Sequence, residues 1–254
     1  MTDSSSAPRL PVLKVIVVAC AWPWYRRTAF VRALLVPYLL LMSLMIAYCY
    51  ADSDVIASTW WAVYAAYVFL FVHLAVNCHR VVLLNEANAS MWTLPKWSWR
   101  ETRFLGWFLL IWFVATVGKM TVIIISTITF TTGSGGEASR PTSGINFADY
   151  VGTVVFWYIF ARLSLVLPSI AVDEKLSLSE TLKRSHANGW RLLVVVCVLP
   201  CVTSFVSQHI LRKNASAAEY IIMLSVWTIF LTIEISALLL SYQELSSYDN
   251  HSGL

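Results

Sequence analysis

The sequence predicts an all-α polytopic membrane protein. We expect six transmembrane helices, an N-terminal interfacial helix, and a short cytoplasmic amphipathic helix before the fifth span. Of the 254 residues, 58% are hydrophobic and only 13% are charged, whereas a soluble domain carries about 25% charged residues. So little polar surface excludes a water-soluble globule and indicates a single integral membrane domain over residues 1–254. The net charge of +4 does not indicate nucleic-acid binding, because the basic residues lie beside apolar stretches.

The N-terminal residues predict a disordered tail (1–10) and then a helix in the headgroup region (11–30). The tail lacks the basic segment and the cleavage site of a secretory signal. The helix is apolar but is interrupted by Lys14 and Pro23, and Arg26 and Arg27 follow among aromatic residues. Roughly a dozen residues between Lys14 and Arg26 are too few to cross a bilayer. We therefore expect Arg26 and Arg27 to reach lipid phosphate from the interface.

Six stretches are long and apolar enough to span a bilayer, which takes about 20 residues. They cover residues 33–51, 58–84, 104–128, 149–172, 190–210 and 218–241. The stretch "TTGSGGEASRPTSG" (131–144) predicts a flexible loop on the outer side. Residues 242–254 form the expected cytoplasmic tail.

A short amphipathic helix is predicted between the fourth and fifth spans. Ser177 and Glu180 have the spacing of a capping box, and Gly189 has the position of a C-terminal stop. Leu178 and Leu182 share one face of this helix. We expect the helix to lie on the cytoplasmic membrane surface.

The distribution of Lys and Arg predicts the orientation. With these spans, about 14 of them fall on one side and about 3 on the other. The positive-inside rule therefore places both termini in the cytoplasm.

Three polar residues on three spans are predicted to lie at one depth. At 1.5 Å per residue, Arg162, Glu234 and His73 all lie about 20–24 Å from the outer end of their helices. We expect Arg162 to pair with Glu234, with His73 nearby. Such a pair could fix the helix packing, or line a water-accessible site for an anion or a proton. Alternatively, Arg162 could extend to the cytoplasmic interface.

Pro168 is predicted to bend the fourth span. A proline at this position frees a carbonyl near Ser164, four residues earlier. The bend is predicted whether Arg162 has a packing role or lines a water-accessible site.

The remaining intramembrane residues do not indicate a cofactor. Lys119 is predicted to extend outward, because its depth does not match that of Glu234. His73 and His209 differ too much in depth to ligate one haem. The five cysteines are interpreted as small apolar fillers. The sequence contains no metal-ligand spacing and no catalytic motif, so we expect no cofactor and no metal.

Basic and aromatic residues alternate at the cytoplasmic ends of the second and third spans. Arg80 closes the second span, and Lys96, Arg100 and Arg103 lie among tryptophans in "MWTLPKWSWRETRF". Beside two spans, this alternation favours lipid headgroup contact.

The stretch "ARLSLVLPSIAVDEKLSLSETLKRSHANGWRLL" resembles a pattern in uncharacterised bacterial multi-pass inner-membrane proteins. It is also similar to the membrane domain fused to some glycerophosphodiester phosphodiesterases. The matching positions are Arg162, Pro168, Asp173 or Glu174, Ser179, Ser185 and Gly189. "HRVVLLNE" with "WRETRFLGW" resembles the earlier hairpin of that pattern. The resemblance implies a six-span fold in a bacterial inner membrane. It implies no hydrolysis, because the catalytic domain is absent from this sequence.

The function we expect is that of a non-enzymatic integral inner-membrane protein. It would act as a membrane-embedded partner or organiser that contacts lipid headgroups, alongside an unidentified membrane-protein partner. The alternative is a small transporter or lipid-handling protein that uses Arg162, Glu234 and His73. An intramembrane enzyme is a third reading, without a catalytic constellation to support it.

Overall fold

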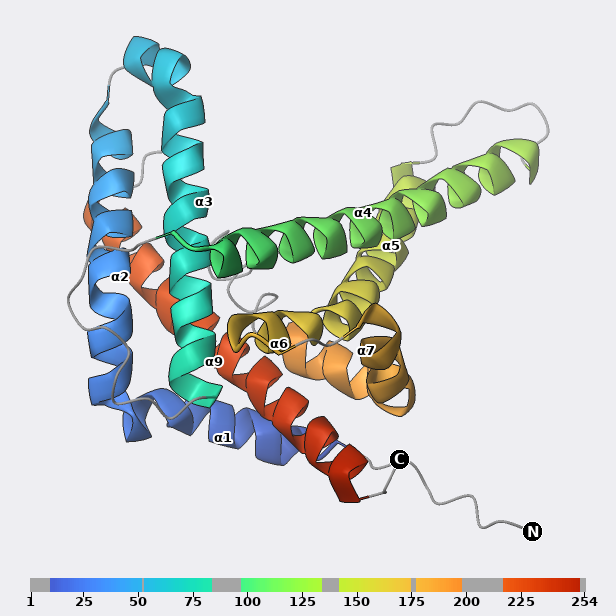
Figure 1. Cartoon of the computed structure of the whole chain (residues 1–254). Coiled ribbons are helices and arrows are strands. Elements are labelled where there is room, and N and C mark those ends of the chain that lie inside the picture. Colours follow the sequence, from blue (N-terminus) through green and yellow to red (C-terminus); the bar gives the residue numbers. More distant parts are fainter. Residues whose placement is uncertain are drawn as a thin grey trace.

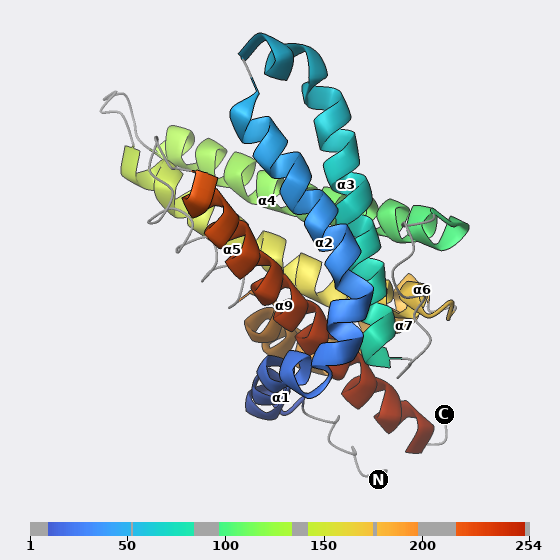
Figure 2. The ribbon, with the colours of Figure 1, turned by 90° about the vertical axis from the view of Figure 1, so that its left-hand side faces the viewer.

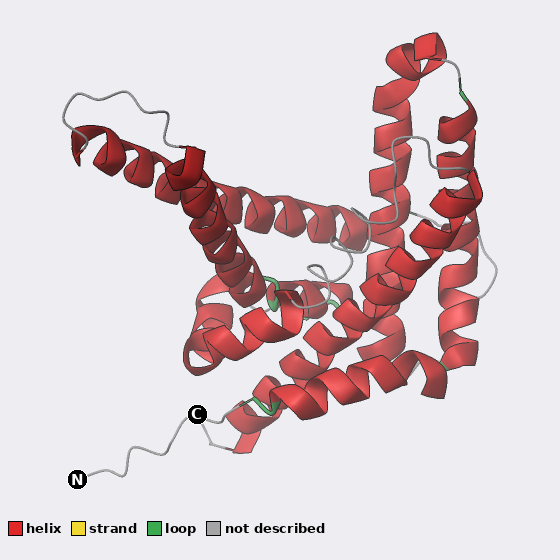
Figure 3. Cartoon of the chain, turned by 180° about the vertical axis from the view of Figure 1, so that it is seen from behind, coloured by secondary structure: helices red, strands yellow, loops and turns green. Residues whose placement is uncertain are grey.

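The computed structural model describes residues 10–51, 53–83, 97–133, 142–174, 177–197 and 217–251. Within these ranges every regular element is a helix and none is a strand (Figure 3), which confirms the all-α class. The elements are α1 (Val12–Tyr25), α2 (Arg27–Tyr50), α3 (Ser53–Leu83), α4 (Trp99–Gly133), α5 (Thr142–Leu163), α6 (Val166–Ala171), α7 (Leu178–Ser185), η1 (His186–Asn188) and α9 (Ala217–His251). Residues 189–197 are also helical.

Five helical segments of the described ranges are long and apolar enough to cross a membrane. They are Arg27–Tyr48, Ser58–Leu83, Trp99–Thr129, Phe147–Ala171 and Ser225–Ser246. The predicted span 190–210, the fifth of the six, lies mostly outside the described residues, so it stays a prediction. Residues 1–9 of the predicted tail also lie outside them. The predicted outer loop 131–144 is shorter than expected, because α4 continues to Gly133 and α5 begins at Thr142.

The long helices meet at one end of the molecule and diverge toward the other. Helices α2 and α3 form one antiparallel hairpin, and α4 and α5 form a second one that points away from it (Figure 1). Helix α9 runs behind the α2–α3 hairpin, and α1 packs across its C-terminal part (Figures 1 and 2). We call the end that holds α1, α6 and α7 the anchoring end.

Buried side chains are concentrated near the anchoring end. In α3 they run from Leu70 to Val82, and in α4 from Glu101 to Ala115. One apolar cluster joins α2, α3, α4, α6 and α9, and a second joins α1, residues 189–197 and α9. In lipid such contacts stabilise by close packing rather than by removal of apolar surface from water.

The fourth predicted span is broken at a turn shortly before Pro168. Helix α5 ends at Leu163, a turn follows, and α6 holds Pro168 in its middle. Proline has no N–H to donate to the carbonyl of Ser164, four residues earlier. The N–H of Leu167 donates to that oxygen instead, at 2.9 Å. All six residues of α6 are buried, so this break lies inside the protein.

Helix α7 begins at the capping box that the sequence predicts. The Ser177 hydroxyl accepts from the Glu180 N–H at 3.2 Å, and the Ser177 N–H donates to the Glu180 carboxylate at 2.7 Å. Hydrogen bonds to the Glu180 carboxylate from the Ser177 backbone N–H and then from the Ser177 side chain hold the pKa of this carboxyl below its usual value, because they stabilise its charged form.

One prediction about α7 is wrong. Gly189 does not stop the helix: its backbone is right-handed helical, and the helical residues continue to 197. A Cβ at Gly189 would lie 2.7 Å from the Tyr158 hydroxyl oxygen, so the glycine is explained by the close approach of α5. Thr181 and Ser185 of α7 are buried, while Leu182 is 37% exposed. Helix α7 therefore turns a small, polar face toward the protein.

Replacing Ser177 with alanine should destabilise the protein by about 1 kcal/mol, the usual cost of losing a helix N-cap. Thermal unfolding in detergent at neutral pH measures this. The part of this difference that comes from the Ser177 side-chain bond to the Glu180 carboxylate should be lost as the pH falls through the lowered pKa of Glu180, because protonation removes the charged acceptor. The bond from the Ser177 backbone N–H remains in the alanine variant.

Ser43→Ala is the matched control, because the Ser43 hydroxyl donates to the Leu39 carbonyl within an exposed helix face. It should change stability by less than about 0.5 kcal/mol. Equal effects of the two substitutions would show that the capping box does not stabilise the fold.

Candidate functional site

Arg162 joins the last turn of α5 to the last turn of α7. Its Nε donates to the Ser185 hydroxyl at 3.1 Å, and its Nη2 donates to the Leu182 carbonyl at 3.0 Å. The guanidinium carbon lies 5.7 Å from the centre of the Tyr158 ring. The last carbonyls of a helix lack helical donors and carry partial negative charge. Arg162 therefore caps the C-terminal end of α7.

The predicted pair of Arg162 with Glu234 is wrong. No hydrogen bond or ion pair between described residues joins them, and none engages the Glu234 carboxyl at all. The physical reason is that equal depth does not place two side chains on facing sides of their helices. Arg162 also lies close enough to the end of α5 to extend onto the carbonyls of α7.

His73 does not join Arg162 and Glu234 in one cluster. It is buried in α3, where its ring stacks on Phe69 with the ring centres 5.9 Å apart. The acidic residue that interacts with it electrostatically is Glu101 of α4. The structure therefore separates the three residues that the sequence analysis grouped.

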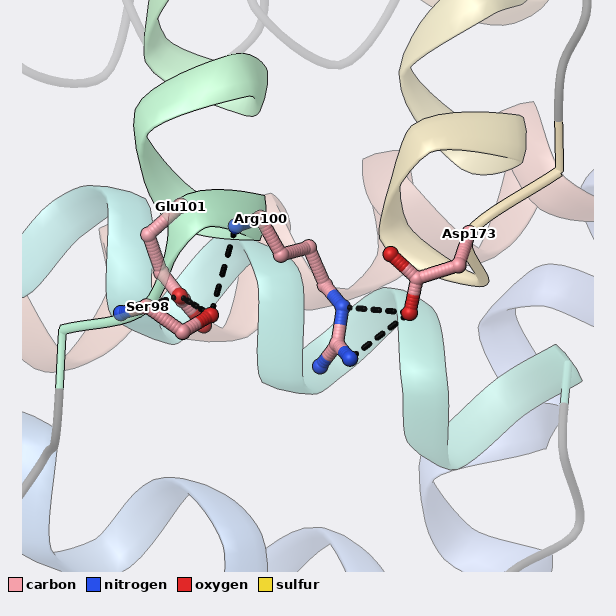
Figure 4. A network of polar contacts seen from close by, with 4 residues as sticks. All are labelled: Ser98, Arg100, Glu101 and Asp173. Atoms are coloured by element: carbon pink, nitrogen blue, oxygen red, sulfur yellow. Dashed lines mark hydrogen bonds and ion pairs between the residues drawn. The ribbon is translucent and has the colours of Figure 1, made fainter.

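Arg100 in the first turn of α4 pairs with Asp173, just beyond α6 (Figure 4). Its Nη2 and Nε lie 2.7 and 2.9 Å from one Asp173 carboxylate oxygen. Ser98 precedes α4 and bonds to Glu101 through its N–H, at 2.8 Å, and through its hydroxyl. This arrangement pairs the Arg100 guanidinium with Asp173 at the partly exposed start of α4, and the predicted lipid headgroup contact stays a prediction.

Asp173 also ends α6. Its φ of +62° is left-handed, a region that aspartate tolerates better than most residues. The N–H of Asp173 donates to the Ile170 carbonyl at 3.2 Å, and the N–H of Glu174 donates to the Ser169 carbonyl at 2.8 Å. These two bonds form a Schellman motif. Aspartate in place of the usual glycine adds the charge that holds Arg100.

Two further contacts attach this region to α9. The Tyr242 hydroxyl donates to the Glu174 carboxylate. Arg184 of α7 donates to the Ser246 hydroxyl at 3.3 Å. The segment from α6 to α7 is thus tied to the C-terminal part of α9 at two points.

Helix α1 is held by its first residues and by a surface ion pair. The Leu10 N–H donates to the buried Asn188 side chain at 2.8 Å. Lys14 forms an ion pair with Glu244 of α9 at 2.7 Å. These contacts join the start of α1 to Asn188 beyond α7 and to the last turns of α9, so all three lie on the same side of the molecule.

Lys119 is paired within the second hairpin. Its ammonium lies 2.8 Å from the Asp149 carboxylate and donates to the Thr153 hydroxyl at 3.1 Å. The sequence predicts that Lys119 does not pair with Glu234, and it does not. Its partner Asp149 was not predicted. A useful signal was available, because Asp149 begins the predicted fourth span at the depth that an outward-extending Lys119 would reach.

The other predicted interface residues take different positions. Arg26 lies over the Trp22 ring, with its guanidinium carbon 5.2 Å from the ring centre. Arg27 is exposed at the start of α2, and Arg80 lies in the last turn of α3. Arg103 is half-buried near the start of α4. Lys96 lies outside the described residues, as does His209.

The part of the chain that the structure describes holds no group of three or more His, Cys, Asp or Glu side chains that could bind a metal. Cys20, Cys78 and Cys197 are not joined in disulfides. His79 is buried against the Phe104 ring, at 5.6 Å between ring centres. The arrangement of these residues supports packing rather than ligation.

Sequence reasoning missed several residues of the anchoring end. Ser98 and Glu101 repeat the spacing of Ser177 and Glu180, so the same capping signal could have found them. Asn188 and Tyr242 gave no comparable signal, because their contacts join segments far apart in the chain.

Comparisons with protein-family models, with curated proteins and with solved structures gave no match. The resemblance to inner-membrane proteins therefore stays a prediction.

Arg162→Gln should destabilise the protein by about 1–3 kcal/mol, because hydrogen bonds made by a charged group are lost. A double-mutant cycle with Ser185→Ala should show a coupling energy of about 1 kcal/mol. Unfolding in detergent measures both quantities.

Arg32→Gln on the exposed start of α2 is the control and should change stability by less than about 0.5 kcal/mol. The exchange Arg162→Glu with Glu234→Arg should recover none of the lost stability. Recovery by that exchange would restore the predicted pair and contradict the capping role.

Three substitutions at Asp173 should separate its two roles. Asp173→Asn keeps a residue that tolerates the left-handed backbone and loses only the ion pair. It should cost about 0.2–1 kcal/mol, because the pair is partly exposed. Asp173→Ala should cost roughly 1–2 kcal/mol more, the penalty of a left-handed backbone.

Asp173→Gly should resemble Asp173→Asn, since glycine adopts this backbone without strain. Urea unfolding in detergent gives the order. An alanine variant as stable as the asparagine variant would show that the left-handed turn is not required.

Proposed function

We propose that this chain is a non-enzymatic integral membrane protein that acts as a membrane-embedded partner or organiser. Its anchoring end would face the cytoplasm and rest on the lipid headgroups of a bacterial inner membrane. The observation that supports this proposal is that the Arg162 guanidinium donates its hydrogen bonds to α7.

A transport site for an anion or a proton needs a charge that the cargo can reach. Both hydrogen-bonding partners of Arg162 belong to α7, and the Tyr158 ring covers one side of its guanidinium. Glu234 does not pair with it. The charge therefore fixes the position of a helix, which favours architecture over transport.

Exposed aromatic and basic residues support headgroup contact at the anchoring end. Trp24 and Trp99 are 78% and 74% exposed, and Arg27 is exposed beside the first of them. Tryptophan favours the membrane–water interface, where its ring is apolar and its N–H can meet water. Arginine nearby can bind lipid phosphate.

The surface of α4 supports a membrane-protein partner. Only 11% of the most apolar part of Trp99–Thr129 is buried inside the chain, against 56% for Phe147–Ala171. Large apolar side chains remain exposed along it, among them Leu109, Trp112, Phe113, Ile124 and Ile128. Another membrane protein could pack on this surface, because helices associate in lipid by close side-chain packing.

Access of water to Ser164 should be blocked. Ser164 lies in the turn after Arg162 and is 1% exposed. We expect Ser164→Cys, in a chain without native cysteines, to resist a membrane-impermeant thiol reagent in right-side-out and inverted vesicles. Labelling is measured by mass spectrometry.

Ser179→Cys on the exposed face of α7 is the control. It should label rapidly in inverted vesicles only, which also tests the proposed orientation. Labelling at position 164 as fast as at position 179 would show an aqueous vestibule. That result would replace the proposal with a transporter or lipid-handling function.

A further inference from the structure

A cavity of 360 Å³ lies between α1, α2 and α9. Phe30 and Leu34 of α2 line it with Ile229 and Ile233 of α9, and the exposed Trp24 ring lines it as well. Ligand cavities in proteins have volumes of about 300–1,000 Å³. An α-helix with its side chains is about 10–12 Å wide, so a cavity of this size suits a flexible chain better than a helix of another protein.

The cavity has one charged end. Of the described residues that line it, Arg27 alone is charged. No hydrogen bond or ion pair between described residues engages the Arg27 guanidinium, which is exposed at the start of α2. A lone cation without an acidic neighbour in the lining favours a ligand group of negative charge.

The length of the cavity corresponds to one leaflet of a bilayer. Along α2 its lining runs from Arg27 to Tyr38, whose hydroxyl hydrogen-bonds with the Ser225 hydroxyl of α9 at 2.7 Å. Along α2 this distance is about 16 Å at 1.5 Å per residue. A bilayer has a hydrocarbon core of about 30 Å, so the apolar walls extend from the headgroup level to about its middle.

We propose that this cavity binds an anionic phospholipid, with one acyl chain between α2 and α9 and its phosphate on Arg27. This site rests on the proposed function, since Arg27 reaches headgroups only if the anchoring end faces them. Arginine suits a phosphodiester because its planar guanidinium can donate two parallel hydrogen bonds. The headgroup preference is for net negative charge, because no acidic residue of the lining balances Arg27.

Photo-crosslinking in lipid nanodiscs tests the site. The full chain is reconstituted in phosphatidylcholine with a small fraction of phosphatidylglycerol that carries a diazirine in the middle of one acyl chain. After illumination, mass spectrometry locates the crosslinked peptides. We expect crosslinks to concentrate on the cavity-facing residues of α2 and α9, and to fall when unlabelled phosphatidylglycerol competes.

Two variants with matched controls test the two parts of the site. Arg27→Gln should reduce crosslinking in the cavity about tenfold, the effect of losing a charged hydrogen bond. Arg32→Gln removes a cation from the same helix outside the cavity lining and should change crosslinking less than about twofold.

Filling the cavity tests the acyl-chain position. Val31 lines the cavity and is 52% exposed, so Val31→Trp adds bulk there without disturbing the core. It should reduce crosslinking by about the same tenfold factor. Val114→Trp places the same bulk on the exposed surface of α4, where Val114 is 40% exposed, and should leave the cavity crosslinks unchanged.

Three results would overturn the proposal. The first is even crosslinking over α4 and the cavity, which indicates bulk lipid only. The second is equal labelling by a phosphatidylcholine probe that Arg27→Gln does not reduce. The third is the absence of crosslinks from the cavity-facing residues of α2 and α9, which leaves the space to another occupant. None of them changes the labelling of Ser164→Cys, so failure of this site and failure of the proposed function remain distinguishable.

Discussion

The attachment of Arg162 to the C-terminal end of α7 determines the arrangement of the anchoring end. Helix α7 has eight residues, and isolated helices of that length are unstable in water. It is held at its N-terminus by its own capping box and at its C-terminus by the Arg162 guanidinium. Its position in turn places Asn188, which binds the start of α1, and Arg184, which binds α9.

The break after α5 makes this attachment possible. A continuous helix through residues 142–171 would carry α6 farther along the membrane normal. The turn at Ser164 and Leu165 instead leaves α6 buried, and Asp173 and Glu174 follow at its end. One acid pairs with α4 and the other accepts a hydrogen bond from α9. The two charges after the break therefore join α6 to two long helices that do not follow it in sequence.

Features that depend on neighbouring residues could be predicted from the sequence, whereas contacts between helices could not. Apolar length predicted five of the described spans, and the spacing of Ser177 and Glu180 predicted a cap, because both depend on neighbouring residues. Arg162 and Glu234 were paired by depth alone. Depth is one of three coordinates, and the direction of a side chain around its helix is set by packing between helices. Gly189 shows the same limit, since a glycine after a helix can permit either a left-handed stop or a close contact.

Arg27 differs from three other cations of the anchoring end in what it contacts. Lys14, Arg100 and Arg162 each have a partner inside the chain, and each partner fixes the position of a helix. Arg27 instead stands at the mouth of an apolar cavity that α1 helps to line as it crosses α9. The contacts that hold α1 across α9 thus also form a wall of the cavity. The same packing of α1 on α9 forms the anchoring end and the cavity that we propose as a lipid site. A lipid bound there would therefore stabilise that packing.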